Sequence, residues 1–148
     1  MRTVREILIN KGNKIWSVLP DSNVFDALLL MADKGIGALL VRDEAGKPVG
    51  VMSERDYARK VILVGKTSRE TKVKEIMSSK VIYATPEMTP EECMALMIGK
   101  RIRHLPVIES DELAGFISIG DIVKAVIDEK EFTIEQLVHY IKDTPQLS

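Results

Sequence analysis

Two segments share one polar pattern, and its residue types and spacing suit the binding of a small charged ligand. The pattern is Ser-x-x-Asp, from Ser53 to Asp56 in SERD and from Ser118 to Asp121 in SIGD. Each copy follows a glycine-containing apolar run at the expected start of a helix, where free N–H groups and the helix dipole attract an anion. The serine hydroxyl can add a donor to a phosphate, whereas the aspartate would repel phosphate and suits the hydroxyls of a ribose. Phosphate together with ribose indicates a nucleotide.

The same spacing also has a purely structural interpretation. A serine followed three residues later by an acid is close to a capping box, in which the serine oxygen accepts the N3 amide and the acid reaches back to the serine amide. As an isolated motif, Ser-x-x-Asp favours this cap. The nucleotide hypothesis therefore depends on the surrounding residues.

The chain is an internal duplication. Residues 16–41 align with 82–107 without a gap, GVMSERDY then aligns with GFISIGDI, and TVREIL at 3–8 matches KVKEIM at 72–77. A unit of roughly 60 residues buries little surface alone, so the two copies are expected to pack on each other. We expect a first domain at 1–70 that includes a short N-terminal helix, a second at 71–131, and a helical tail at 132–148.

Each copy predicts the order strand, helix, strand, strand, helix. A short strand is expected near 15–18 or 81–84, and a helix then begins near Asn23 or Thr89, both acceptable N-caps. The apolar runs ALLV and LPV predict buried strands, with PVGVM and LAGFI as their hairpin partners, and a second helix follows each motif serine. The fold class is mixed α/β (α+β), with a helical layer on a small sheet.

Other residues at equivalent places in the two copies could complete a nucleotide site. Ile36, Gly37 and Ala38 leave an apolar slot where a purine could lie, and Arg103 and His104 at the equivalent place offer a guanidinium fork and an imidazole to phosphate. Alternatively, Arg103 is a solvated surface charge and His104 is a histidine packed in its strand.

The predicted helices are apolar on more than one face. In the first copy Val24, Ala27 and Met31 form one stripe, while Phe25 and Leu29 belong to a second stripe. A helix that is apolar on two sides must be covered twice, and a second subunit is the expected cover. The sequence therefore predicts a homodimer.

Composition excludes several classes of protein. With 148 residues, an apolar share of 45%, and 21 basic against 22 acidic residues, the chain is expected to be globular, without a general attraction to nucleic acid or anionic membrane. No apolar run reaches the roughly 18 residues of a membrane span, and the charged N-terminus does not resemble a signal peptide, so a cytoplasmic location is expected.

Catalysis is not expected. The single cysteine, Cys93, is interpreted as a small buried apolar residue, and no metal-ligand cluster, nucleophile with a base, or Walker-type loop is present in the sequence. We expect no catalytic residues, no metal and no catalytic cofactor.

The duplicated unit with GVMSERD and GFISIGD, the RIRHLPV strand entry and the KVKEIM helix resemble a tandem pair of cystathionine-β-synthase (CBS) domains, the Bateman module. The resemblance covers about residues 3 to 130 and looks like the stand-alone type. It implies a regulatory sensor that binds AMP, ADP, ATP, NAD or S-adenosylmethionine in two clefts, forms a homodimer and modulates a partner protein. The alternative is an interaction module whose clefts stay empty.

The resemblance also implies roles for individual residues. Ribose would bind Asp56 and Asp121, with Ser53 and Ser118 beside the ribose and phosphate. Contacts to the base would come from the opposite copy: Trp16, Ile36, Gly37 and Ala38 for the Asp121 site, and Ile82, Ile102, Arg103 and His104 for the Asp56 site. Phosphate contacts from Arg103 and His104 predict that the Asp121 cleft binds the ligand more tightly. In the Asp56 cleft, Arg55 partly compensates for the missing phosphate contacts.

Overall fold

The computed structural model describes residues 2–12, 14–129, 139 and 141–147. The first repeat contributes α1 (Val4–Lys11), β1 (Ser17–Val18), α2 (Val24–Lys34), β2 (Ala38–Arg42), β3 (Pro48–Ser53), α3 (Glu54–Lys60) and the 3-10 turn η1 (Ile62–Val64). The second contributes α4 (Val73–Ile76), α5 (Pro90–Lys100), β4 (His104–Glu109), β5 (Glu112–Ser118) and α6 (Ile119–Glu129). Most of the tail helix expected at 132–148 lies outside the described residues.

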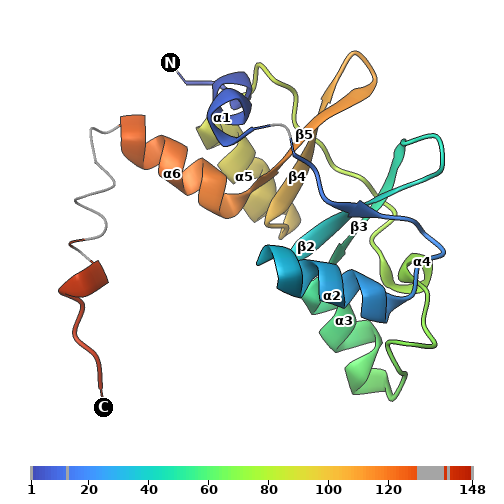
Figure 1. The fold of residues 1–148 in the computed structure, drawn as a ribbon. Helices are drawn as coiled ribbons and strands as arrows, with labels where there is room; N and C mark the ends of the chain where they lie inside the picture. Colours follow the sequence, from blue (N-terminus) through green and yellow to red (C-terminus); the bar gives the residue numbers. More distant parts are fainter. Residues whose placement is uncertain (1, 13, 130–138, 140, 148) are drawn as a thin grey trace.

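Each repeat folds around its own small sheet (Figure 1). In the first, β1 pairs in parallel with β2, and β2 pairs antiparallel with β3. In the second, β4 and β5 form an antiparallel pair, and the strand expected at 81–84 is reduced to one parallel bridge between Ala84 and Val107. This bridge lies at the place of the β1–β2 pairing, so the predicted topology is conserved and only the strand length is wrong.

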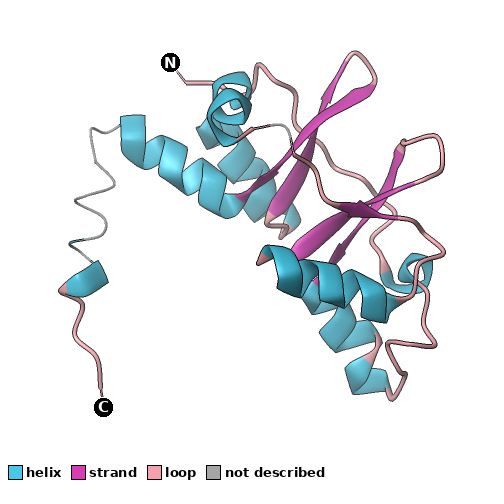
Figure 2. Ribbon diagram, in the orientation of Figure 1, coloured by secondary structure: helices cyan, strands magenta, loops and turns pink. Residues whose placement is uncertain are grey.

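The helix starts follow the predicted caps. The Asn23 side chain accepts a hydrogen bond from the Asp26 amide at 2.8 Å, and Thr89 and Glu92 form a reciprocal capping box at the start of α5. The helices α2 and α3 lie beside the strands of the first repeat, and α5 and α6 beside those of the second (Figure 2). The mixed α+β class with a helical layer is confirmed.

The two repeats exchange their N-terminal helices. The α1 helix packs its buried residues into the core of the second repeat, and α4 packs into the core of the first. Equivalent backbone hydrogen bonds fix the two helices: Val4 N donates to Met88 O at 2.9 Å, and Val73 N donates to Ser22 O at 2.8 Å. The domain boundary proposed at residue 70 follows the repeat in the sequence, whereas the packing crosses it at both helices.

Close backbone approach makes the exchange possible. A Cβ built on Gly115 would lie 2.5 Å from Leu8 Cδ2, and one built on Gly50 would lie 2.5 Å from Met77 Sδ. Glycine at these equivalent strand positions therefore leaves the space that the exchanged helix fills. The result is an intramolecular pair with approximate twofold symmetry, as the duplication predicts.

The two apolar stripes of the first helices have different environments. Val24, Ala27 and Met31 are buried in the core, whereas Leu29 is 54% exposed, and Ile98 on the equivalent helix of the second repeat is 70% exposed. Cys93 is fully buried, and burial raises the pKa of its thiol to about 11, which agrees with its interpretation as a small core residue.

Candidate functional site

The two Ser-x-x-Asp motifs are built almost identically at a strand-to-helix junction. At the β3–α3 junction, Asp56 Oδ2 accepts from Ser53 N at 2.9 Å and from Ser53 Oγ at 3.1 Å, while the Asp56 amide donates to Ser53 Oγ at 3.2 Å. At the β5–α6 junction the same three distances between Ser118 and Asp121 are 2.8, 3.0 and 3.2 Å.

Both motifs are thus capping boxes, and the structural interpretation is confirmed. The cap does not use the whole carboxylate, because the serine donors of each box meet Oδ2. An ionised carboxyl group can accept about four hydrogen bonds. Each aspartate can therefore hold its helix start with one oxygen and offer the other oxygen to a ligand hydroxyl.

The entry to the second strand of each repeat lies beside the motif of the same repeat. Ala38 is the register partner of Ser53, and the Glu54 amide donates to Gly37 O at 3.0 Å. In the second repeat His104 pairs with Ser118, and the Ile119 amide donates to Arg103 O at 2.8 Å.

These pairings bring Gly37 and Ala38 together with Ser53, and Arg103 and His104 together with Ser118. The second grouping places Arg103 and His104 beside the second motif, and their role in the Asp121 cleft stays a prediction. The contacts recorded for these residues join each motif to its own repeat, so the base contacts expected across the two repeats stay predictions.

His104 is a packed strand histidine. Its ring stacks on Phe116, with 5.5 Å between the ring centroids. Burial lowers the pKa of His104, and the positive charges of Lys11 and Arg103 lower it further against the opposing effect of Asp121. Arg103 itself is exposed, so of the two it is the available cation.

The structure adds one residue to the site that the sequence did not indicate. Lys11, the last residue of α1, donates to Asp121 Oδ2 at 2.7 Å and to Phe116 O at 2.7 Å. Although burial raises the pKa of Asp121, hydrogen bonds from Lys11 and Ser118 outweigh it, so this pKa lies below the ordinary value. The signal for Lys11 was missing because 110 residues separate it from its partner.

The residues expected to contact the base are partly buried against the cores of their own repeats. Trp16 and Ile36 pack on the first core, and Ile82 and Ile102 on the second. Trp16 also has the Lys34 ammonium 4.2 Å from its ring centroid, a cation–π arrangement. Arg55, expected to compensate at the Asp56 site, is exposed in the first turn of α3.

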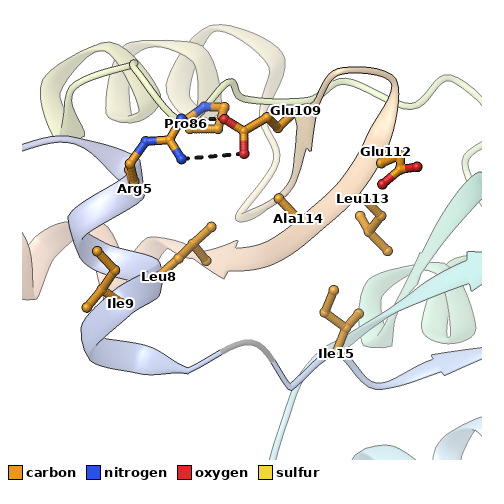
Figure 3. A pocket seen from close by; sticks show the side chains of 9 residues that line it. All are labelled: Arg5, Leu8, Ile9, Ile15, Pro86, Glu109, Glu112, Leu113 and Ala114. Atoms are coloured by element: carbon orange, nitrogen blue, oxygen red, sulfur yellow. Dashed lines mark hydrogen bonds and ion pairs between the residues drawn. The ribbon is translucent and has the colours of Figure 1, made fainter.

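A cavity of about 470 Å³ lies between α1, the segment that follows it and the outer part of the β4–β5 hairpin (Figure 3). Leu8, Ile9 and Leu113 line its apolar part, and Arg5 bridges to Glu109 at its edge. A second cavity of about 400 Å³ lies at the β2–β3 turn. Neither of these two cavities is lined by a motif serine or aspartate.

Comparison with known proteins assigns the family. The model of the CBS domain matches residues 4–63 and 73–128, so the chain belongs to the CBS domain family and carries a tandem pair. Among the described residues no helix combines the length and the apolar character that a bilayer crossing requires.

Individual relatives support this assignment. The mitochondrial CBS domain-containing protein CBSX3 of Arabidopsis thaliana is 38% identical over 149 aligned residues, which cover 95% of this chain and 72% of the relative. The structure of a putative signal-transduction protein with CBS domains from Burkholderia ambifaria is 50% identical, with a TM-score of 0.84, and the match covers 90% of this chain and 99% of that one.

A more distant structure shares the fold alone. It is a CBS domain pair in complex with 5′-methylthioadenosine and S-adenosyl-L-methionine, 22% identical, with a TM-score of 0.75 and coverage of 87% of this chain and 98% of that one.

Proposed function

We propose that this CBS pair is a regulatory module that binds an adenosine-containing ligand, of the AMP, ADP, ATP, NAD or S-adenosylmethionine type, and changes its interaction with a partner protein. The observation that supports it is the repeated carboxylate: in each motif the serine donors use Oδ2 of the aspartate. Asp56 and Asp121 would accept ribose hydroxyls, and Ser53 and Ser118 would lie beside the phosphate. The module has no catalytic role in this proposal.

Specific groups favour adenosine nucleotides over other small ligands. Arg103 is an exposed cation beside the second motif, and the distant structure with the same fold holds two adenosine derivatives. AMP, ATP and NAD combine the ribose and the phosphate that the motif suits, so they are the first ligands to test.

The module is proposed to act as a homodimer. Leu29 on α2 and Ile98 on α5 are exposed on equivalent helices of the two repeats, and a second copy of the chain would cover them. Light scattering should report about twice the chain mass of 16.6 kDa at micromolar concentration. A monomer at that concentration would contradict the dimer. The cytoplasmic location stays a prediction.

One observation favours a second candidate, an interaction module that takes no ligand. Both motif aspartates already satisfy a capping box, and a cap of this kind contributes about 1 kcal/mol to stability without any ligand.

Thermal unfolding with and without AMP, ATP, NAD and S-adenosylmethionine distinguishes the two candidates. A ligand at a hundredfold excess over its dissociation constant adds about 2.7 kcal/mol of stability, so the melting temperature should rise clearly with at least one of the four. The double variant Asp56→Ala, Asp121→Ala should lose this rise. Unchanged melting with all four ligands would favour the module without a ligand.

A further inference from the structure

Lys11 occupies the oxygen of Asp121 that also caps the helix. Three donors meet Asp121 Oδ2: Ser118 N at 2.8 Å, Ser118 Oγ at 3.0 Å and Lys11 Nζ at 2.7 Å. The Lys11 side chain is only 35% exposed, and its second partner is the carbonyl of Phe116. The carboxylate of the second motif is therefore held by a cation from the exchanged helix α1.

The first motif has a different arrangement. Lys60 Nζ lies 3.5 Å from Asp56 Oδ1, the oxygen outside the capping box, and donates to Ile76 O at 2.9 Å. This lysine belongs to the same helix as Asp56, and its side chain is 48% exposed. Among the described residues, only Ser53 donates to Asp56 Oδ2, and the Lys60 ammonium lies near Oδ1 instead.

We propose that Lys11 makes the Asp121 cleft selective for ligands that carry a phosphate. The inference rests on the proposed function, since it assumes that ribose binds Asp121. The cap leaves Oδ1 of Asp121 to a ribose hydroxyl, so the ribose and the Lys11 ammonium would share one carboxylate. A hydroxyl donor on Oδ1 withdraws part of the negative charge that holds the ammonium, so Lys11 gains from a second anion.

The chemistry of the ligand decides whether Lys11 gains that second anion. A 5′-phosphate on the same ligand supplies it, so Lys11 adds a charge-assisted hydrogen bond. Adenosine and 5′-methylthioadenosine offer no anion, so the Lys11 ammonium keeps only Asp121 and the Phe116 carbonyl as partners.

The neighbouring groups favour Lys11 and Arg103 as the cations of this cleft. His104 lies close enough to Lys11 and Asp121 for their charges to act on it, and burial disfavours its charged form. A phosphate that reaches this cleft therefore meets the ammonium of Lys11 and the guanidinium of Arg103, while the His104 ring is stacked on Phe116. The proposed role of Lys11 is therefore ligand selection, although Lys11 lies outside the Ser-x-x-Asp motif.

Calorimetric titration with AMP, adenosine and the uncharged 5′-methylthioadenosine tests the proposal. Asp56→Ala serves as the background, so that ribose binding is confined to the Asp121 cleft. In this background AMP should bind at least about tenfold more tightly than either uncharged ligand. Adding Lys11→Met should reduce the AMP-to-adenosine affinity ratio by about tenfold, whereas Lys11→Arg should retain most of it.

The control is Lys47→Met, which removes the same charge from an exposed position before β3 and should leave the ratio unchanged. Equal affinities for AMP and adenosine in the Asp56→Ala background would overturn the inference without any change at Lys11. So would a ratio that Lys11→Met leaves intact while both ligands still bind. If none of the three ligands binds the unmodified protein, the proposed function itself fails, which is a distinguishable result.

Discussion

The two repeats share a backbone and differ in the cation that reaches the motif aspartate. The three capping distances agree within 0.1 Å between Ser53–Asp56 and Ser118–Asp121. Counted from the aligned helix starts, Lys11 of the first repeat corresponds to Lys80 of the second. Only Lys11 is brought to an aspartate.

The cause is the length of the exchanged helix. The α1 helix runs for 8 residues and ends at Lys11, whereas α4 has 4 residues and ends at Ile76. After α4 the chain turns extended, and Ser78 exchanges hydrogen bonds of 2.9 and 3.0 Å with Val51. The duplication therefore preserves the local hydrogen bonds that form each motif. The different lengths of α1 and α4 determine which side chain contacts the motif aspartate.

The largest expected effect concerns the two aspartates. Asp121→Ala and Asp56→Ala each delete the charge-assisted hydrogen bonds that we propose each carboxylate makes to ribose, so each should cost roughly 2–4 kcal/mol of binding free energy in its own cleft, or about 30- to 1,000-fold in affinity. If the Asp121 cleft is the tighter one, Asp121→Ala should abolish the high-affinity phase of an AMP titration.

The comparison fails if the two variants behave alike. Asp56→Ala should leave the high-affinity phase largely intact, because the capping box of Ser118 and the contact of Lys11 with Asp121 are both at the second motif. Circular dichroism of each variant controls for folding, since each substitution also removes a cap of about 1 kcal/mol. Equal loss of the tight phase in both variants would contradict unequal clefts.

A smaller effect is expected where the exchanged helices approach the strands. An alanine Cβ at position 50 would lie 2.5 Å from Met77 Sδ and 3.0 Å from the backbone oxygen of Ser78. At position 115 the nearest atoms all belong to the Leu8 side chain, the closest at 2.5 Å. Because a side chain can move and a paired backbone cannot, Gly50→Ala should cost about 2–3 kcal/mol and Gly115→Ala about 1–2 kcal/mol of unfolding free energy.

Urea denaturation of both variants checks this order. Gly99→Ala is the control, because a Cβ there meets nothing within 4 Å and alanine favours the helix. It should stabilise the protein by about 0.5–1 kcal/mol. A Gly115→Ala variant less stable than Gly50→Ala would show that α1 is packed more rigidly than α4.

Most of the fold was predictable because the determining patterns are local and occur twice. Asn23 and Thr89 cap their helices as expected, and Ser53 and Ser118 begin theirs. The duplication itself predicted a symmetric pair. The strand predicted at 81–84 does not form in full, because a few β-forming residues are not enough to establish strand pairing. Its pairing is limited to the bridge between Ala84 and Val107.

The site was predictable only in part. The motif aspartates are identified by their spacing from a serine, but the exchange of α1 and α4 depends on which core accepts each helix, and both helices have similar sequences. Lys11 reaches Asp121 through that exchange alone. A contact across 110 residues follows from the tertiary fold and has no counterpart in the local pattern.

The smallest expected effect concerns pH and distinguishes the two strand entries. His104 of the second repeat occupies the place of Ala38 in the first, and burial, together with Lys11 and Arg103, holds its pKa below the ordinary 6.5 against the effect of Asp121. The unfolded chain therefore binds the proton more readily than the folded chain does. The stability that His104 contributes is retained above about pH 6.5 and decreases as the pH falls from there through the folded-state pKa.

Unfolding free energies measured at intervals from pH 7.5 to 5 should show this decrease, and His104→Gln should remove it. His139→Gln is the matched substitution at an exposed histidine, because that side chain is 80% exposed. A profile that His104→Gln does not alter would mean that protonated His104 is tolerated beside Asp121, and would return it to the cations available for phosphate.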